Sequence, residues 1–595
     1  MRPAHLVRRF RQRVGRSQKQ VEKLGSNAGQ HLEQHFFNRF DNLLSVRWFV
    51  FGWVGLFLLL IAGVLVQNFG LSTYYQKLAT IPGGIYTEGV YGRFSNANPI
   101  YAASEADTTI SRLIFASLFT NSDNGHLQPE LAASYSVNSI GTIYTIHLKP
   151  HLTWQDGTPL TSSDVAFTYH LIQNPNALSP LQNSWQGVQI TTPNPLSVVF
   201  TLPDPLASFP YSLTTGILPK HILQSIPVAN LRSADFNTIH MVGSGPFRLQ
   251  GLQVTSTSNP DNEESTIALT PFAHFSSGRP KLSKFIINVY ANQTELEQAF
   301  LSGQLTAMDT SGVSASNIPA ITSGIVAHSL ILRAANMVFF NVSSGLLADQ
   351  QVRQALVSGA NVPAIVAHLG YKTPLVREPL LAGQLAYNPT YAQASYNPSY
   401  AAQLLNSDGW VVGKNGLRKK QNSQLAFTLT AADTSENHLV GNLLQKQWRS
   451  IGVNLTLQYL SPIDFQNAVT YHQYQALLNG ISIGIDPDVF VYWASSQASI
   501  NVANDLNFSQ FENPTADSSL EAGRTRLNPA LRVIEYQPFL QAWQQAAPAL
   551  GLYQPRLLYL THGSVAGLEN GPIVTSADRF NDVQNWEIRQ AKVTD

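Results

Sequence analysis

The chain has no cysteine in its 595 residues. Disulfide bonds, metal sites built on cysteine ligands and a lipid anchor attached to cysteine are therefore excluded. Charged residues are also scarce, at 12% of the chain against about 25% in typical soluble proteins. A net charge of +1 over this length gives no electrostatic footprint for nucleic acid, so we expect no nucleic-acid partner.

The sequence also lacks catalytic motifs. It has no phosphate-binding loop that ends in Lys-Ser or Lys-Thr, and no G-x-S-x-G nucleophile elbow. His31 and His35 have the i, i+4 spacing of a metal pair, but without a third ligand a solvated helix face explains them better. The other candidate histidines are scattered along the chain: His221, His240, His274 and His562. We therefore expect no enzyme activity, no metal site and no cofactor.

One long apolar run is present, from Trp48 to Val66, and it contains no charged side chain. At about 1.5 Å per residue, a helix of this length just spans a hydrocarbon core of roughly 30 Å. Inside lipid the backbone must satisfy its own hydrogen bonds, which favours a helix. We predict a transmembrane helix within residues 48–69 and, because no second such run follows, a single-pass membrane protein.

The flanks of this run predict its orientation. Residues 1–47 hold ten basic and three acidic residues, a net charge of +7, and short basic flanks stay in the cytoplasm. We therefore expect a cytoplasmic N-terminus at the cell membrane, a linker over residues 70–82 and an extracytoplasmic remainder. The basic segment and the apolar run are both too long for a cleaved signal peptide, and no A-x-A site follows, so we expect an uncleaved anchor.

Beyond the linker, helix and strand patterns alternate. Apolar residues at core spacing predict a helix from Glu105 to Leu118, and Thr161 with Asp164 forms a capping box that predicts the start of another. Residues 425–459 have the pattern of a strand, an amphipathic helix and a second strand, which is typical of a βαβ unit. The alternation predicts mixed α/β lobes.

The same region carries a series of segments in a fixed order: GGIYTEGVYGRFSNANPI, LQPELAASYSV, YTIHLKPHLTWQDGTPLTSSDVAFTYHLI, ILPKHIL, VGSGPFRL, FFNVSSGLLADQQVRQALVSGANVPAIV and YNPSYAAQLLNSDGW. Together they resemble the family 5 extracytoplasmic solute-binding proteins, the dipeptide- and oligopeptide-binding proteins of peptide-type ABC importers. The resemblance covers about Gly83 to Gly567. It implies an α/β, two-lobed periplasmic-binding-protein-like fold of type II, with the extra small subdomain of the peptide-binding class.

The resemblance also implies a layout and a function. Lobe I is expected over residues 83–335 with an inserted subdomain at about 120–235, lobe II over 336–548, and a return to lobe I over 549–595. The implied function is that of a membrane-tethered, monomeric substrate-binding component that delivers peptides to an ABC permease and its ATPase. Two alternatives stay open, a cell-surface sensor or adhesion module on the same fold, and a receptor for a non-peptide solute.

A ligand site is implied in LLNGISIGIDPDVFVYWASSQ, residues 477–497, which reads as a strand followed by a helix. In the family, the equivalent strand lies at the cleft and pairs through its backbone with an extended peptide. Tyr492 and Trp493 fit either the cleft or the core. The candidate cleft residues are Gly480, Ile481, Ser482, Ile483, Asp486, Asp488, Tyr492 and Trp493.

This stretch departs from the family pattern at one position that matters for the ligand. Many peptide-binding members have an aspartate three residues before the Asp-Pro pair, where it binds the α-ammonium of the ligand, and this chain has Ile483 there. The tryptophan position three residues earlier is Gly480. Because a buried ammonium without a carboxylate is costly, either another acid serves, the amine stays solvated, or the ligand is not a free-amine peptide. Asp486 and Asp488 are the nearby acids, although N-capping of a helix over residues 490–495 also explains Asp488.

Overall fold

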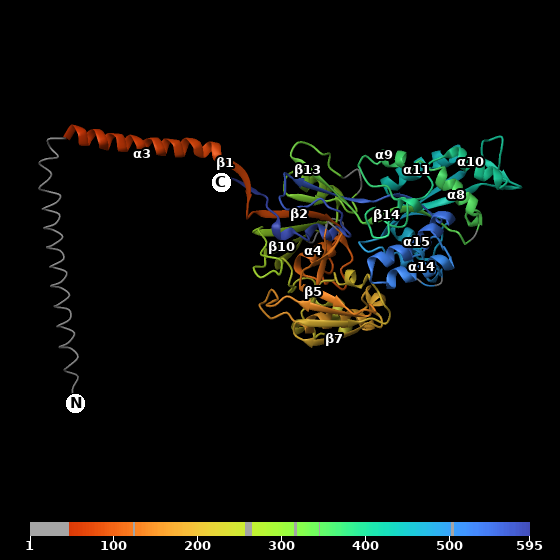
Figure 1. Ribbon diagram of the computed structural model, residues 1–595, viewed down its shortest axis with the longest axis horizontal. Coiled ribbons are helices and arrows are strands. Elements are labelled where there is room, and N and C mark those ends of the chain that lie inside the picture. Colours follow the sequence, from red (N-terminus) through yellow and green to blue (C-terminus); the bar gives the residue numbers. More distant parts are fainter. Residues whose placement is uncertain are drawn as a thin grey trace, which may run out of the picture. The chain divides into compact units, whose positions relative to one another are not determined.

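Figure 1 shows the computed structural model of the protein, which describes residues 47–122, 125–255, 264–313, 318–343, 345–500, 502 and 505–594. These residues form two units. One ends at Ala79 and includes residues 590–594, and the other spans Thr80–Arg589. His31 and His35, with most of the basic N-terminal segment, lie outside the described residues.

The first unit is built on a long helix, α3 (Arg47–Tyr75). Its segment Trp48–Gln67 is long and apolar enough to cross a membrane, and no other helix in the described residues meets that criterion. None of this segment is buried against other described residues. The strand β1 (Gln76–Ile81) follows and pairs with β23 (Arg589–Thr594), where the sequence pattern predicted a linker.

The second unit begins with a lobe whose mixed sheet has seven strands in the order β13-β22-β12-β2-β11-β10-β9. The central strand β2 runs parallel to β11 and β12, and the other pairs are antiparallel. Helices α4 (Glu105–Ile114) and α7 (Gln293–Leu301) pack on this sheet. The strands are β2 (Ile85–Tyr91), β9 (Phe247–Thr255), β10 (Glu264–Pro271), β11 (Lys284–Tyr290), β12 (Ala307–Asp309), β13 (Ile325–Ile331) and β22 (Arg556–His562).

Helix α4 ends at Ile114, earlier than the predicted Leu118, because the chain turns away to meet a loop. Phe115 is already extended. The carbonyl of Ile114 accepts hydrogen bonds from the Gly245 amide at 2.8 Å and from the Gln155 side chain at 3.1 Å. These loop donors take the place of the amide that a further helical turn would supply.

A small antiparallel sheet extends from this lobe, in the order β5-β6-β8-β7. The predicted capping box is confirmed, since Thr161 and Asp164 form it at the start of α5 (Ser162–Gln173), which packs on this sheet. Aromatic rings pack between them in tilted and edge-on pairs, with Trp185 close to Tyr169, Phe200 and Phe209. The strands are β5 (Ala132–Val137), β6 (Ile143–Leu148), β7 (Gln189–Asn194) and β8 (Ser197–Thr201).

The other lobe is built on a five-stranded sheet in the order β19-β18-β20-β14-β21. The predicted βαβ unit is confirmed, since β18 and β19 are parallel and α11 connects them. Gly452 follows α11 with φ +91°, a conformation that glycine adopts without steric cost. The elements are β14 (Ala334–Phe340), β18 (Ala426–Ala432), β19 (Asn454–Leu460), β20 (Ala476–Ser482), β21 (Ala549–Tyr553), α8 (Gln350–Ser358), α10 (Pro398–Ser407), α11 (Ser435–Ser450), α14 (Pro514–Thr525) and α15 (Pro529–Ala546).

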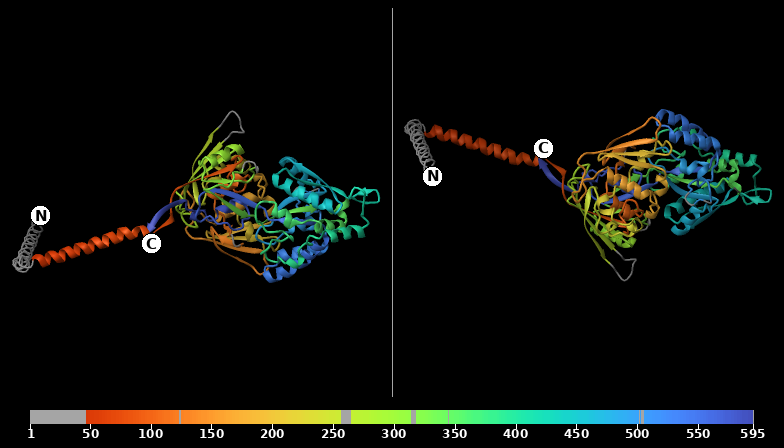
Figure 2. Two further views of the ribbon diagram at one scale, coloured as in Figure 1. Left: turned by 90° about the horizontal axis from the view of Figure 1, so that it is seen from above. Right: turned by 90° about the horizontal axis from the view of Figure 1, so that it is seen from below.

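Two short connections join the lobes. The chain passes from β13 to β14, and later from β21 back to β22, with only a few residues between each pair of strands. The two connections are bonded to each other, since the Leu332 amide donates to the Pro555 carbonyl at 2.9 Å. The return to lobe I, predicted from residue 549, begins only after β21, because β21 pairs with β14 in the sheet of lobe II. Figures 1 and 2 show the two lobes side by side. Short adjacent connections of this kind are typical of hinges between lobes.

Candidate functional site

A cavity of about 660 Å³ opens between the two lobes. Most of its lobe I lining comes from α4 and the residues around it, from the subdomain segment 208–216 and from the C-terminal segment 574–578. Lobe II contributes residues 483–488, which follow β20. Cavities of this size are usual for ligands of a few hundred daltons. The segment that the sequence analysis singled out thus forms one wall of the cavity.

The structure places the predicted site residues in three environments. Ile483, Asp486 and Asp488 line the cavity. Gly480 and Ser482 are exposed on β20. The remaining three lie in or against the core of lobe II: Ile481, Tyr492 and Trp493.

The backbone of β20 has one open edge near the cavity. On one side β20 pairs with β14 along its whole length. On the other side it pairs with β18 only over Ala476–Leu478, so residues 479–482 have no strand partner there among the described residues. An open edge of this kind can accept an extended peptide through main-chain hydrogen bonds. The Tyr492 hydroxyl already donates to the Ser482 carbonyl at 2.8 Å.

Asp486 is occupied by an internal partner. Its two carboxylate oxygens accept bonds from both terminal nitrogens of Arg532, on α15, at 2.6 and 2.7 Å. Both side chains are almost fully buried. Burial lowers the pKa of Arg532, but the hydrogen bonds and charge of Asp486 outweigh it and raise that pKa overall. Asp486 is therefore neutralised by a fixed cation and is poorly placed to receive an ammonium group.

Asp488 links the two lobes. One carboxylate oxygen accepts a bond from the Ser208 hydroxyl of lobe I at 2.9 Å and lies 3.3 Å from Arg524 of α14. The other accepts from the Phe490 amide at 3.4 Å, at the start of α13 (Phe490–Trp493). This helix is shorter than the predicted 490–495. The N-cap residue of α13 is Val489, so Asp488 does not cap this helix as the sequence suggested, although it contacts the first helical amide. Through Ser208 it closes one rim of the cavity.

We expect Ser208→Ala to weaken ligand binding roughly tenfold, because a hydrogen bond from one lobe to a charged acceptor on the other favours the closed state. Calorimetric titration of the wild type and the variant with the same ligand measures the two dissociation constants. Ser225→Ala, an exposed serine of the same subdomain whose hydroxyl bonds only locally, serves as the control and should bind normally. Equal affinities for Ser208→Ala and the wild type would contradict this role.

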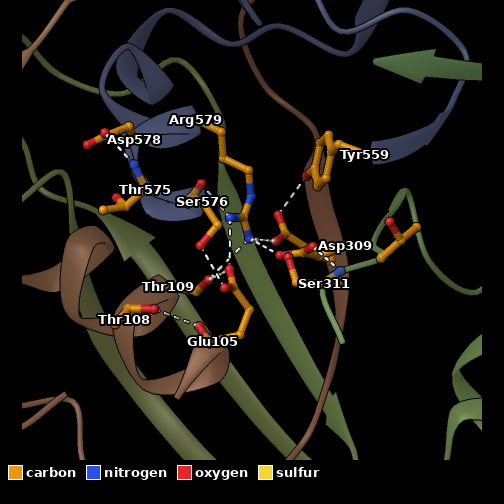
Figure 3. A network of polar contacts seen from close by, with 12 residues as sticks. Glu105, Thr108, Thr109, Asp309, Ser311, Tyr559, Thr575, Ser576, Asp578 and Arg579 are labelled. Atoms are coloured by element: carbon orange, nitrogen blue, oxygen red, sulfur yellow. Dashed lines mark hydrogen bonds and ion pairs between the residues drawn. The ribbon is translucent and has the colours of Figure 1, made fainter. Parts of the chain in front are cut away.

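The opposite wall carries a network of buried charges centred on Arg579 (Figure 3). Arg579, in the 3-10 helix η12 (Ser576–Phe580), has no exposed side-chain surface. Its guanidinium lies 2.6 Å from Glu88, 2.9 Å from Asp309 and 3.1 Å from Glu105. Glu88 and Asp309 are fully buried, whereas Glu105 retains 20% exposure and lines the cavity. The network therefore reaches from the sheet core to the cavity wall.

The three carboxylates share one cation, and burial raises the pKa values of two of them, Glu88 and Glu105. Burial raises the pKa of Glu88 and outweighs the opposing charge of Arg579. Burial, followed by the charge of Asp309, raises the pKa of Glu105 to about 7. Burial lowers the pKa of Arg579, but the surrounding carboxylates raise it well above its ordinary value. Arg579 therefore stays charged while Glu105 titrates near neutral pH.

Sequence reasoning missed several residues of this cleft: Glu105, Ser208, Arg524, Arg532 and Arg579. Glu105 was visible only as the first residue of a predicted helix. Glu88 and Arg579 are separated by 491 positions in the chain, and no local pattern reports such a pair. The single local signal was a charged residue inside an otherwise apolar strand, Glu88 in IYTEGVY, since buried charges require partners.

Comparison with known proteins identifies the architecture. A family model described as "Bacterial extracellular solute-binding proteins, family 5 Middle" matches residues 126–501, well over half of the chain. The chain belongs to this family. As a family 5 solute-binding protein it is a binding protein and not an enzyme, which confirms the prediction of no catalytic activity. Its solute-binding domain is extracytoplasmic.

Individual relatives agree with this membership. The oligopeptide-binding protein AppA of Bacillus subtilis is 23% identical over 526 residues, which cover 85% of this chain and 91% of AppA. A protein of Brucella ovis named for ABC-transporter peptide binding is 27% identical over 495 residues, covering 79% of this chain and 86% of the relative.

Solved structures confirm the two-lobed fold predicted for this family 5 protein. AppA from Bacillus subtilis in complex with a nonapeptide gives a TM-score of 0.67 at 21% identity, covering 86% of this chain and all of that one. NikZ from Campylobacter jejuni in complex with Ni(L-His) gives a TM-score of 0.68 at 23% identity, covering 85% of this chain and 99% of NikZ. The fold is thus shared by proteins crystallised with quite different ligands.

Proposed function

We propose that this protein is the membrane-tethered substrate-binding component of an ABC importer and that it binds peptides in the cavity between its lobes. The observation that carries the proposal is the cavity itself, about 660 Å³ between two lobes joined by two adjacent short connections. Such a hinge lets the lobes close on a ligand, and the closed form is then delivered to a permease and its ATPase. The protein acts as a monomer in this role.

Support for a peptide ligand comes from the wall formed by lobe II. The open edge of β20 lies directly before Ile483, Asp486 and Asp488, which line the cavity. Main-chain pairing along this edge would hold peptides regardless of their sequence. The relatives named for peptide binding support the same class of ligand.

Support for the tether comes from α3. Its segment Trp48–Gln67 has the length and composition of a membrane span, and the basic residues before it favour a cytoplasmic N-terminus. In a chain without cysteine, this helix would take the place of a lipidated cysteine as the anchor. Protease protection on intact cells, combined with the intact mass of the purified protein, tests both the orientation and the absence of cleavage. A secreted form that begins near residue 70 would contradict the tether.

We expect peptides to raise the melting temperature of the detergent-solubilised full chain, because a ligand that binds only the folded state stabilises it by mass action. The gain is about 2.7 kcal/mol at a ligand concentration 100 times Kd. The panel contains pooled tripeptides to pentapeptides, free amino acids, sugars and nickel with histidine. The second candidate function is a receptor for a non-peptide solute, because Ile483 stands where many peptide-binding members have the aspartate for the ligand's α-ammonium. A shift with a non-peptide class and none with peptides would favour that candidate.

A further inference from the structure

We infer that Glu105 receives a positively charged group of the ligand, so that the substrate class is cationic peptides with an accessible ammonium or guanidinium group. This inference rests on the proposed function and specifies the chemistry of the same cavity. Glu105 of lobe I would bind the positively charged group that the apolar Ile483 of lobe II cannot bind.

The position of Glu105 suits this role. It is the first residue of α4, it lines the cavity and its side chain keeps 20% of its surface exposed. One carboxylate oxygen lies 3.1 Å from Arg579, and the other accepts a bond from the Ser576 hydroxyl at 2.6 Å. Ser576 also lines the cavity. The carboxylate is thus held in place from behind while one side faces the ligand space.

The other acidic residues of the cavity wall already have partners. Asp486 is held by Arg532, and Asp488 by Arg524 and Ser208. Asp578 is partly buried and accepts bonds from the amides of Val574 and Thr575, each at 3.0 Å. Glu105 differs from Asp486 and Asp488 because its cation, Arg579, is shared with two further carboxylates.

The charge balance of the wall favours a cation. Its acidic residues are Glu105, Asp486, Asp488 and Asp578. Arg112 is the only basic residue on the cavity wall in the described part of the chain, and it is paired with Glu130 at 2.9 Å. Behind the wall, three carboxylates surround the single guanidinium of Arg579. An ammonium group beside Glu105 would supply the positive charge that this cluster lacks.

The same arrangement links ligand binding to pH. Four groups face Glu105: Asp309 from β12, Arg579 and Ser576 from η12, and Thr109 from α4. Two more lie on the far side of Arg579, namely Glu88 of β2 and Tyr559 of β22. Glu105, with its pKa raised to about 7 by burial and by Asp309, carries a proton in mildly acidic solution. A bound cation favours the ionised form, so binding releases that proton. Affinity should therefore fall by up to about tenfold for each pH unit below pH 7.

The test compares two peptide pools on the detergent-solubilised full chain. The first contains tripeptides to pentapeptides with free N-termini and one lysine. The second is identical in length and composition except that the N-termini are acetylated and norleucine replaces lysine. We expect the first pool to bind at least roughly tenfold more tightly to the wild type, and Glu105→Gln to abolish that preference. Glu521→Gln, which removes the same charge from an exposed position on α14, serves as the control and should keep the preference.

Affinity is measured from about pH 5.5 to about pH 7, where the lysine ammonium stays protonated and the α-ammonium nearly so. A merely structural role of Glu105 would not change this pH profile. The wild type should lose affinity toward acid, whereas Glu105→Gln should bind with a flat profile. Equal binding of both pools to the wild type would overturn the inference and leave the proposed function standing. If neither pool binds and a non-peptide solute does, the proposed function fails, and the inference fails with it.

Discussion

Replacing Arg579 by methionine is expected to lower the free energy of unfolding by about 3–5 kcal/mol at neutral pH, because breaking a buried ion pair leaves its partners uncompensated. Glu88 and Asp309, both fully buried, would lose the cation at 2.6 and 2.9 Å that holds them. Chemical denaturation of the full chain, followed by tryptophan fluorescence and circular dichroism, measures the change.

The pH dependence of this loss identifies its cause. Burial already raises the pKa of Glu88 in the folded state, and without Arg579 this pKa rises further above that of the unfolded chain. Such groups cost stability at high pH and cost progressively less as protonation neutralises them. The difference in the free energy of unfolding between the variant and the wild type should therefore become smaller as the pH falls toward 5. A gap that stays constant with pH would mean that lost packing, and not charge, explains the destabilisation.

The matched control is Arg526→Met. Arg526 is 57% exposed and lies 3.6 Å from Glu535 at the surface of lobe II. Exposed pairs contribute at most about 1 kcal/mol, so this variant should unfold nearly as the wild type does. A loss for Arg526→Met comparable with that for Arg579→Met would contradict the special status of the buried network.

Gly243→Ala is expected to destabilise the protein by about 3 kcal/mol or more, since overpacking against a backbone leaves little room to relax. A Cβ atom at Gly243 would lie 1.9 Å from the carbonyl oxygen of Ile114. That carbonyl ends α4, and the Gln155 side chain bonds both the Ile114 carbonyl and the Gly243 amide. The clash would push α4 away from the sheet, and with it the cavity residues Glu105 and Arg112.

The control for this prediction is Gly251→Ala in β9, where an added Cβ would meet no atom within 4 Å. Denaturation midpoints and peptide-induced thermal shifts of the two variants, measured side by side, check the prediction. Gly251→Ala should retain both stability and binding. If Gly243→Ala did the same, the close contact with Ile114 would not matter for the fold.

The fold of this protein was largely predictable from its sequence. The capping box at Thr161 and Asp164 and the βαβ unit over residues 425–459 depend on contacts between residues close in the chain, and both are confirmed. The ordered segments that resemble family 5 predicted the two-lobed architecture, which the comparisons confirm. The apolar run from Trp48 to Val66 predicted a helix, and α3 forms there. Its membrane role stays a prediction.

The site was predictable only in outline. The resemblance led to residues 477–497, and the structure places Ile483, Asp486 and Asp488 of that stretch at the cavity. The sequence left open whether Asp486 or Asp488 replaces the missing aspartate. The structure shows that both carboxylates already have partners from distant parts of the chain. Asp486 pairs with Arg532, and Asp488 accepts a hydrogen bond from Ser208.

By itself the sequence therefore determined the positions of several helices and strands, the family resemblance and the stretch that reaches the cavity. These properties follow from side-chain periodicity and short-range hydrogen bonds, which a linear pattern records. The tertiary structure alone decided which acid is available to a ligand. The charge state of a carboxylate depends on its burial and on the charges around it. For Glu105 these charges are Arg579, 474 positions away, and Asp309 at the end of β12.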